Sequence, residues 1–164
     1  MSGDYTLAAA LGYAERGWRV VPIKAGEKRP AISDWVKFAS TDVEVIERWW
    51  SANPGCGVGI VTGKASGMFV LDVDGEKGMA TLRRLEDNNE LELPSTSMVR
   101  TGNGYHMYFA YPDFEIRNDS HKRLGPGLDI RGEGGQVVAP PTIHPSGQSY
   151  EWLIITDELA RLWQ

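Results

Sequence analysis

The stretch that most restricts the fold is FVLDVDGEKG, residues 69–78, in which an apolar run ends in two aspartates separated by one valine. The apolar run is typical of a buried strand. Residues two apart in a strand point to the same face of the sheet, roughly 6.5–7 Å apart. Asp72 and Asp74 are therefore expected to project together while Val73 points into the core. Two carboxylates this close repel each other unless positive charge lies between them.

This carboxylate pair is a candidate ligand set for Mg²⁺ or Mn²⁺, which prefer hard oxygen donors. Two such ions clamp the attacking and leaving oxygens in phosphoryl transfer. The alternative is a strand running into an Asp-Gly turn, with Asp74 bonding its own backbone. Asp129, in GLDIRGEGG, starts another expected strand and is a third candidate, unless it is only a turn acid. A shared metal site requires Asp129 to face the same cavity as Asp72.

The segment RTGNGYH, residues 100–106, is a candidate for holding phosphates. Thr101 and the backbone N–H groups from Gly102 to Gly104 are predicted to form an anion-binding nest. Arg100 and His106 add side-chain donors. The alternatives are a plain hairpin turn and a histidine packed in the core. The segment is neither a Walker loop nor a dinucleotide fingerprint.

Further basic residues are candidates for phosphate contacts. Lys28 lies in a loop whose polar end is expected to reach a nucleotide. Arg131, two residues after the third acid, is expected to share its strand face. Lys122 and Arg123, in the polar loop 117–127, are candidates for touching a nucleic-acid backbone, or are simply solvated. His144, in PPTIHPSG, is interpreted as a structural loop residue.

Hydrophobic periodicity and turn residues predict helices and strands in mixed order. Helices are expected over residues 4–16, 43–50 and 76–89, with a last one beginning at 157. Strands are expected over 18–23, 58–63, 67–74, 97–102, 105–111, 128–132, 135–140 and 150–154. Because the order lacks strict βαβ alternation, the predicted class is α+β with a mainly antiparallel sheet, forming one domain over residues 1–164.

Composition narrows the classes of function. The formal net charge of −5 argues against a simple nucleic-acid-coating protein, which is usually basic. The single Cys56 excludes an internal disulfide framework and a thiolate zinc cluster. No apolar stretch approaches the roughly 18 residues of a membrane span, so no membrane partner is expected. The expected compartment is the cytoplasm.

Four blocks of sequence occur in a characteristic order: AALGYAERGWRVVPIKAGEKRPAISDW, VGIVTGKASGMFVLDVDG, VRTGNGYHMYF and LGPGLDIRGEGGQVVAPPTIHPSGQSYEW. Over about Leu7 to Trp152 the chain resembles the bifunctional DNA primase/polymerase family of plasmids and phages, a branch of the archaeo-eukaryotic primase superfamily. The resemblance implies an RRM-like, mainly antiparallel catalytic sheet packed against an N-terminal α/β lobe, with the active site between them.

The family's three catalytic motifs fall on candidates already named. Its D-x-D/E pair matches Asp72 and Asp74, its nucleotide-binding histidine matches His106, and its single metal-binding acid matches Asp129. The resemblance implies two Mg²⁺ or Mn²⁺ ions, a single-stranded DNA template with a primer, dNTPs or NTPs, and a fused or separate helicase. The chain is then the N-terminal domain of a longer replication protein. It lacks the Cys/His zinc-binding insertion of some relatives, so polymerisation is better supported than priming.

The expected function is template-directed nucleotidyl transfer, acting as a DNA polymerase and primase in phage or plasmid replication, in the host cytoplasm. Two alternatives remain from other classes. A metal-dependent nuclease would use the same three carboxylates. A non-catalytic single-strand-binding module would stack bases on aromatic side chains. The tryptophans available for stacking look like core or interface residues instead: Trp18, Trp35, Trp49 and Trp50.

Overall fold

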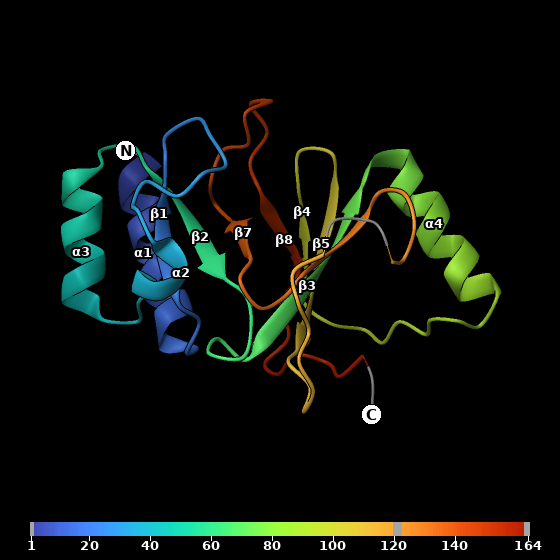
Figure 1. Cartoon of the computed structure of the whole chain (residues 1–164). Helices are drawn as coiled ribbons and strands as arrows, with labels where there is room; N and C mark the ends of the chain where they lie inside the picture. The colour runs from blue at the N-terminus through green and yellow to red at the C-terminus, as the bar shows by residue number, and fades with distance from the viewer. Residues whose placement is uncertain (1, 120–122, 163–164) are drawn as a thin grey trace.

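Two antiparallel sheets lie side by side between helices at the two ends of the molecule (Figure 1). The computed structural model of the chain describes residues 2–119 and 123–162. Its helices are α1 (Ser2–Glu15), α2 (Trp35–Phe38), α3 (Val43–Ala52) and α4 (Gly75–Asp87). Its strands are β1 (Val20–Ile23), β2 (Gly57–Val61), β3 (Met68–Asp74), β4 (Met98–Arg100), β5 (Gly104–Ala110), β6 (Leu128–Arg131), β7 (Gln136–Ala139) and β8 (Glu151–Ile154).

The N-terminal lobe is a three-stranded sheet in the order β1-β2-β7, packed with α1 and α3. The α3 helix begins at Asp42, whose carboxylate accepts hydrogen bonds from the backbone N–H groups of Glu44 and Val45. This satisfies two donors that the first helical turn leaves free. Ile46 and Trp50, four residues apart, lie on one helix face and are buried against the core.

The second sheet has the order β6-β3-β5-β4-β8, with β3 near its centre. Alternation along β3 divides its side chains between two cores. Phe69, Leu71 and Val73 belong to the cluster that packs under α4. Val70 belongs to the cluster that joins this sheet to the N-terminal lobe. The next residue on the inter-lobe face is Asp72, followed by Asp74. Both carboxylates therefore lie on the face toward the N-terminal lobe, beyond the buried part of the strand.

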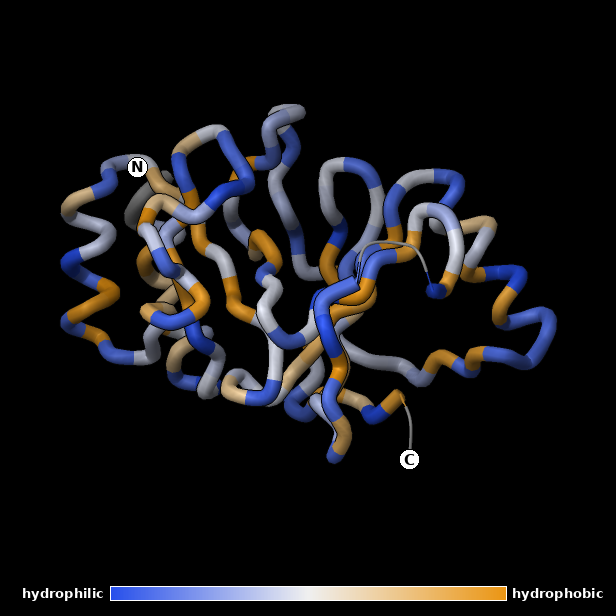
Figure 2. The backbone as a smooth tube through the Cα atoms, in the orientation of Figure 1, coloured by the Kyte–Doolittle hydropathy of each residue, from blue (hydrophilic) through white to orange (hydrophobic). Residues whose placement is uncertain are grey.

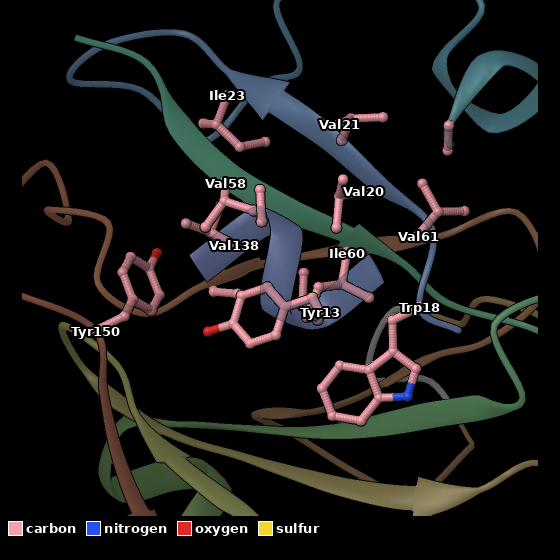
Figure 3. Packing of buried hydrophobic residues seen from close by; sticks show 14 of the residues in the cluster. Tyr13, Trp18, Val20, Val21, Ile23, Val58, Ile60, Val61, Val138 and Tyr150 are labelled. Carbon is pink, nitrogen blue, oxygen red and sulfur yellow. The ribbon is translucent and has the colours of Figure 1, made fainter. Parts of the chain in front are cut away.

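An aromatic group fills the space between the two sheets. Tyr13 and Trp18 lie between the strands of the N-terminal lobe and those of the second sheet (Figure 3). The ring of Trp18 lies 5.6 Å from that of Tyr108 on β5 and 6.4 Å from that of Trp152 on β8. Figure 2 shows hydrophobic residues mostly along the strands and hydrophilic ones mostly on the outer loops. The inter-lobe core therefore joins β5 and β8 of the second sheet to the N-terminal lobe.

The α+β class with antiparallel sheets is confirmed, and four helices are present in the described part of the chain. The helix expected from residue 157 is wrong over 157–162, which is not helical. Ala160 instead pairs with Phe109 beside β5, and its carbonyl accepts from the Ala110 N–H at 2.9 Å. The short helix α2 is not among the helices expected from the sequence. No helix among the described residues is long and apolar enough to cross a membrane.

Candidate active site

Strand pairing places three of the predicted site residues in one row across the second sheet. Asp72 on β3 is the direct partner of His106 on β5 and of Asp129 on β6. Directly paired residues project from the same face of a sheet, about 4.5–5.5 Å apart at their Cβ atoms. The two acids and the histidine therefore meet on the inter-lobe face, although more than 20 residues separate each from the next in the chain.

Two basic side chains offset the charge of the acids. Arg131 Nη2 lies 3.1 Å from Asp129 Oδ2 and 3.5 Å from Asp72 Oδ2, so its guanidinium contacts both carboxylates. His106 Nε2 lies 3.4 Å from Asp72 Oδ1 on the other side. Burial raises the pKa of Asp72, but the hydrogen bond from His106 and the charges of His106 and Arg131 outweigh it and hold the pKa below its usual value.

His106 is the most enclosed member of the row, with 9% of its side chain exposed. Its Nε2 faces Asp72, and its Nδ1 is buried with no hydrogen-bond partner among the residues of the structure. The ring of Tyr150 lies 6.2 Å away. Burial, reinforced by the negative charge of Asp72, raises the pKa of Tyr150 and keeps it a neutral phenol. His106 is therefore buried, as the packed-core interpretation expects, and its role in binding a nucleotide stays a prediction.

Asp74 lies at the exposed end of β3, beside the turn that joins β4 to β5. Its Oδ1 accepts a hydrogen bond from Asn103 Nδ2 at 2.8 Å. Within the turn, the hydroxyl of Thr101 accepts from the N–H groups of Asn103, at 3.3 Å, and Gly104, at 2.9 Å. The expected anion nest thus has an internal acceptor for two of its donors. Gly104 is required sterically, since a Cβ there would overlap the Val73 carbonyl oxygen.

Arg100 lies on the opposite face of the sheet from the acids. Its neighbour Val99 is the partner of His106, while Arg100 pairs with Tyr105 and forms an ion pair with Glu151 at 2.8 Å. A cleft of about 680 Å³ opens on that side, between the β4–β5 turn and the start of α4. The predicted nucleotide-binding residues in its lining are Arg100, Thr101, Gly102 and Gly104. The three acids and His106 do not line it.

The remaining basic candidates are more scattered. Lys28 is exposed in the loop after β1, where its carbonyl accepts from Gln136 Nε2 of β7 at 3.1 Å. Arg123 is also exposed, and its Nε lies 3.9 Å from Asp119 Oδ2. Lys122 lies outside the described residues. The structure therefore holds the backbone of Lys28 beside β7 of the N-terminal lobe and leaves Arg123 on a surface loop.

The donor chemistry of the row suits a divalent cation. Carboxylate oxygens are the ligands that Mg²⁺ and Mn²⁺ prefer, and Asp72 and Asp129 face each other directly. Within the part of the chain described, no group of three or more His, Cys, Asp or Glu side chains is arranged to hold one ion. The positive guanidinium of Arg131 lies between the two carboxylates instead. A positive side chain thus already contacts both carboxylates, and the metal site expected from the sequence stays a prediction.

The structure adds residues to the site that the sequence did not single out. Asn103 contacts Asp74, and Tyr150 lies beside His106. His144, expected to be only a loop residue, lies against the β4–β5 turn. Its ring is so close to Gly102 that a Cβ there would overlap it. No local motif marks these three residues. Their roles depend on how separate loops converge, which periodicity does not reveal.

The fold and the site together define an α+β protein whose central strands present acids and basic groups at one face, an arrangement suited to phosphoryl-transfer chemistry. The family model for the bifunctional DNA primase/polymerase N-terminal domain matches residues 10–163, and the chain belongs to this family. Membership implies nucleotidyl transfer of the primase/polymerase type, with DNA and nucleotides as substrates and a general dependence on divalent metal. A comparison with curated proteins found no match.

Proposed function

We propose that the chain joins (d)NTPs to the 3′-hydroxyl of a primer on a single-stranded DNA template, and that it also synthesises primers. The observation that carries the proposal is the direct pairing of Asp72 with both Asp129 and His106. This pairing places the two carboxylates beside the imidazole of His106 on adjacent strands. The exposed Asp74 lies two residues further along β3, on the same face. Rigid strands, not loops, position these groups.

In this proposal Asp72, Asp74 and Asp129 hold two Mg²⁺ or Mn²⁺ ions. When bound, the ions would lower the pKa of the primer hydroxyl and stabilise the charge of the triphosphate. Asp72 is suited to this role because its pKa is held low, so that it is a carboxylate at neutral pH. The contacts of Arg131 with Asp72 and Asp129 keep the acids together when no ion is present.

The basic groups are proposed to bind the nucleotide. His106 contributes its ring beside Asp72, and Arg131 and Lys28 contribute positive charge from β6 and from the N-terminal lobe. Arg100, Thr101, Gly102 and Gly104 approach from the other side of the turn. Their place in the 680 Å³ cleft supports a contact with the nucleotide or the nucleic acid there.

The test is extension of a labelled primer on a template, with Mg²⁺ or Mn²⁺ and with dNTPs and NTPs in parallel. Asp72→Asn is expected to lower the rate at least about a hundredfold, because it removes a charge that the transition state needs. Asp87→Asn, at the exposed end of α4, is the matched control and should retain the wild-type rate. Omitting the primer shows whether synthesis starts de novo.

Two results would contradict the proposal. Wild-type rates in the Asp72→Asn variant would remove the acid from the chemistry. Shortening of labelled DNA by the wild-type chain, with metal but no nucleotide, would instead support a nuclease built on the same carboxylates. Because both assays use the same DNA and metal, the two activities are separated in one experiment.

The setting of the reaction belongs to the same proposal and rests on the sequence resemblance. It places the chain, as one catalytic domain over residues 1–164, in phage or plasmid replication within the host cytoplasm. A fused or separate helicase would expose the template, and Lys122 and Arg123 would contact it. Co-purification of a helicase with the full-length replication protein tests the partnership.

A further inference from the structure

The loop 141–149 forms a small hairpin that holds His144 against the β4–β5 turn. The His144 N–H donates to the Gln148 carbonyl at 2.7 Å, and its own carbonyl accepts from the Gly147 N–H at 2.8 Å. Ile143 pairs with Ser149 in the same hairpin. The backbone of His144 is therefore fixed on both sides by hydrogen bonds.

The ring of His144 is fixed as well. Its Nδ1 accepts a hydrogen bond from the backbone N–H of Ser146 at 3.0 Å, and the Ser146 hydroxyl lies 2.8 Å away. A backbone N–H only donates, so the neutral ring carries its proton on Nε2. No residue in the described structure accepts from this Nε2. The Nε2–H group of His144 is thus able to donate a hydrogen bond to a ligand, and backbone hydrogen bonds hold the loop that carries it.

The surroundings of His144 link it to the site. The ring lies over Gly102, where a Cβ would overlap it. The next residue of the β4–β5 turn, Asn103, donates from its Nδ2 to Asp74 Oδ1 at 2.8 Å, so the ring lies beside the turn that contacts the end of β3. Burial and the positive charge of Lys28 lower the pKa of His144, and the negative charge of Asp74 opposes them. The loop that carries His144, the β4–β5 turn and the end of β3 therefore converge there.

We propose that His144 Nε2–H forms a subsite for the non-transferred phosphates of the incoming nucleotide. The proposal rests on the function proposed above. The neutral ring donates one hydrogen bond at Nε2, and phosphate oxygens only accept hydrogen bonds. The turn against which the ring lies also contacts Asp74, the most exposed of the three acids, so a phosphate held there lies beside the end of β3. The backbone of DNA offers the same chemistry, and the test separates the two sources.

The probes are a dNTP analogue with a methylene bridge between its α- and β-phosphorus atoms, the matching dNMP, and a short single-stranded DNA. Binding is measured by isothermal titration with Mn²⁺ for wild type, His144→Ala and His144→Gln. Losing a hydrogen bond to a charged group weakens binding about ten- to hundredfold. This loss is expected for His144→Ala with the triphosphate analogue only. His144→Gln retains an N–H donor and should recover most of the affinity.

A double-mutant cycle makes the assignment specific to the ring. Gly102→Ala adds a methyl group where the ring lies, so it should displace His144 and weaken triphosphate binding by a similar factor. In the His144→Ala background it has no ring to displace, so its cost to triphosphate binding should be smaller than in the wild type. Circular dichroism of each variant establishes that the fold is retained. An equal loss in both backgrounds would overturn the role of the ring.

Failure of this inference is distinguishable from failure of the proposed function. If wild type extends primers but His144→Ala binds the triphosphate analogue normally, the subsite is wrong and the polymerase assignment stands. If His144→Ala weakens only DNA binding, the ring holds the nucleic-acid backbone and the inference is overturned. If His144→Ala weakens analogue binding while wild type fails to extend primers, the subsite is supported and the polymerase assignment fails.

Discussion

At the scale of single residues, Arg131 explains how two acids can share one face of the sheet. Its guanidinium contacts Asp72 and Asp129, and His106 contacts Asp72 from the other strand. A guanidinium is always charged and presents several N–H donors in one plane, so it can bridge two carboxylates. The repulsion expected from the sequence is thus offset by side chains of the same sheet.

The first prediction concerns Arg131→Met in the absence of divalent ions. Removing the bridge leaves two half-buried carboxylates facing each other, so the free energy of unfolding should fall by about 1–3 kcal/mol. Millimolar Mn²⁺ should raise the melting temperature of this variant more than that of wild type, because the ion replaces the missing charge. Thermal melts with EDTA and with Mn²⁺ measure both effects.

Arg131→Lys is the control, because it keeps one positive charge at the site. It should fall between wild type and Arg131→Met in both measurements. If Mn²⁺ shifts all three proteins equally, the ion does not bind between the acids, and the metal assignment of Asp72 and Asp129 is wrong.

Some features of the site can be predicted from the sequence better than others. The two-residue period of a strand predicts that Asp72 and Asp74 share a face, because this requires no knowledge of neighbours. The meeting of Asp72 with His106 and Asp129 depends on pairing between distant strands, and the family resemblance suggested it. Arg100 lies on the far face because the β4–β5 turn pairs it with Tyr105, a register that the turn residues alone do not fix.

At the scale of elements, Tyr13 fastens α1 to the rest of the molecule. Its hydroxyl donates to the Pro140 carbonyl and accepts from Trp152 Nε1 at 3.0 Å. These partners belong to the segment after β7 and to β8, so one side chain joins the first helix to both lobes. Figure 3 shows its ring in the space between the sheets.

The second prediction is that Tyr13→Phe destabilises the chain by about 1–3 kcal/mol at neutral pH, because two buried polar groups lose their partner. Burial raises the pKa of Tyr13 to about 12, against the hydrogen bond from Trp152. The unfolded chain ionises near pH 10, so the stability that Tyr13 contributes is complete below pH 10 and is lost toward pH 12.

Urea unfolding of wild type and Tyr13→Phe between pH 7 and pH 11.5 measures the difference. The gap between the two proteins should shrink as the pH rises above 10. A gap that stays constant across this range would show that Tyr13 is not buried as a neutral phenol.

The helix expected from residue 157 shows where element prediction fails. DELARLWQ contains good helix formers, but Ala160 lies next to Phe109 and accepts a backbone hydrogen bond from Ala110. Pairing with the rest of the protein therefore outweighs local propensity. By contrast, the α3 helix was predictable, because its cap at Asp42 and its apolar spacing are both local signals.

At the scale of the whole molecule, one hydrophobic cluster joins the two lobes. It includes Val20, Val58 and Val138 of the three-stranded sheet together with Val70 and Tyr108 of the five-stranded sheet. Neither lobe keeps this surface buried if the other unfolds. The lobes are thus expected to depend on each other for stability.

The third prediction is that the chain unfolds in a single transition. Urea curves followed by far-ultraviolet circular dichroism and by tryptophan fluorescence should have the same midpoint and the same slope. Most of the tryptophans report on the N-terminal lobe and the inter-lobe core, whereas circular dichroism reports on all elements. Separate midpoints would mean that the lobes unfold independently.

The row on the second sheet also limits how the length of this chain can change. Inserting or deleting one residue within β3, β5 or β6 would turn every later side chain of that strand to the other face. A carboxylate would then enter the apolar layer under α4, and a leucine or valine would take its place at the site. Changes of length are compatible with this sheet only outside its paired strands, in the loops that join them.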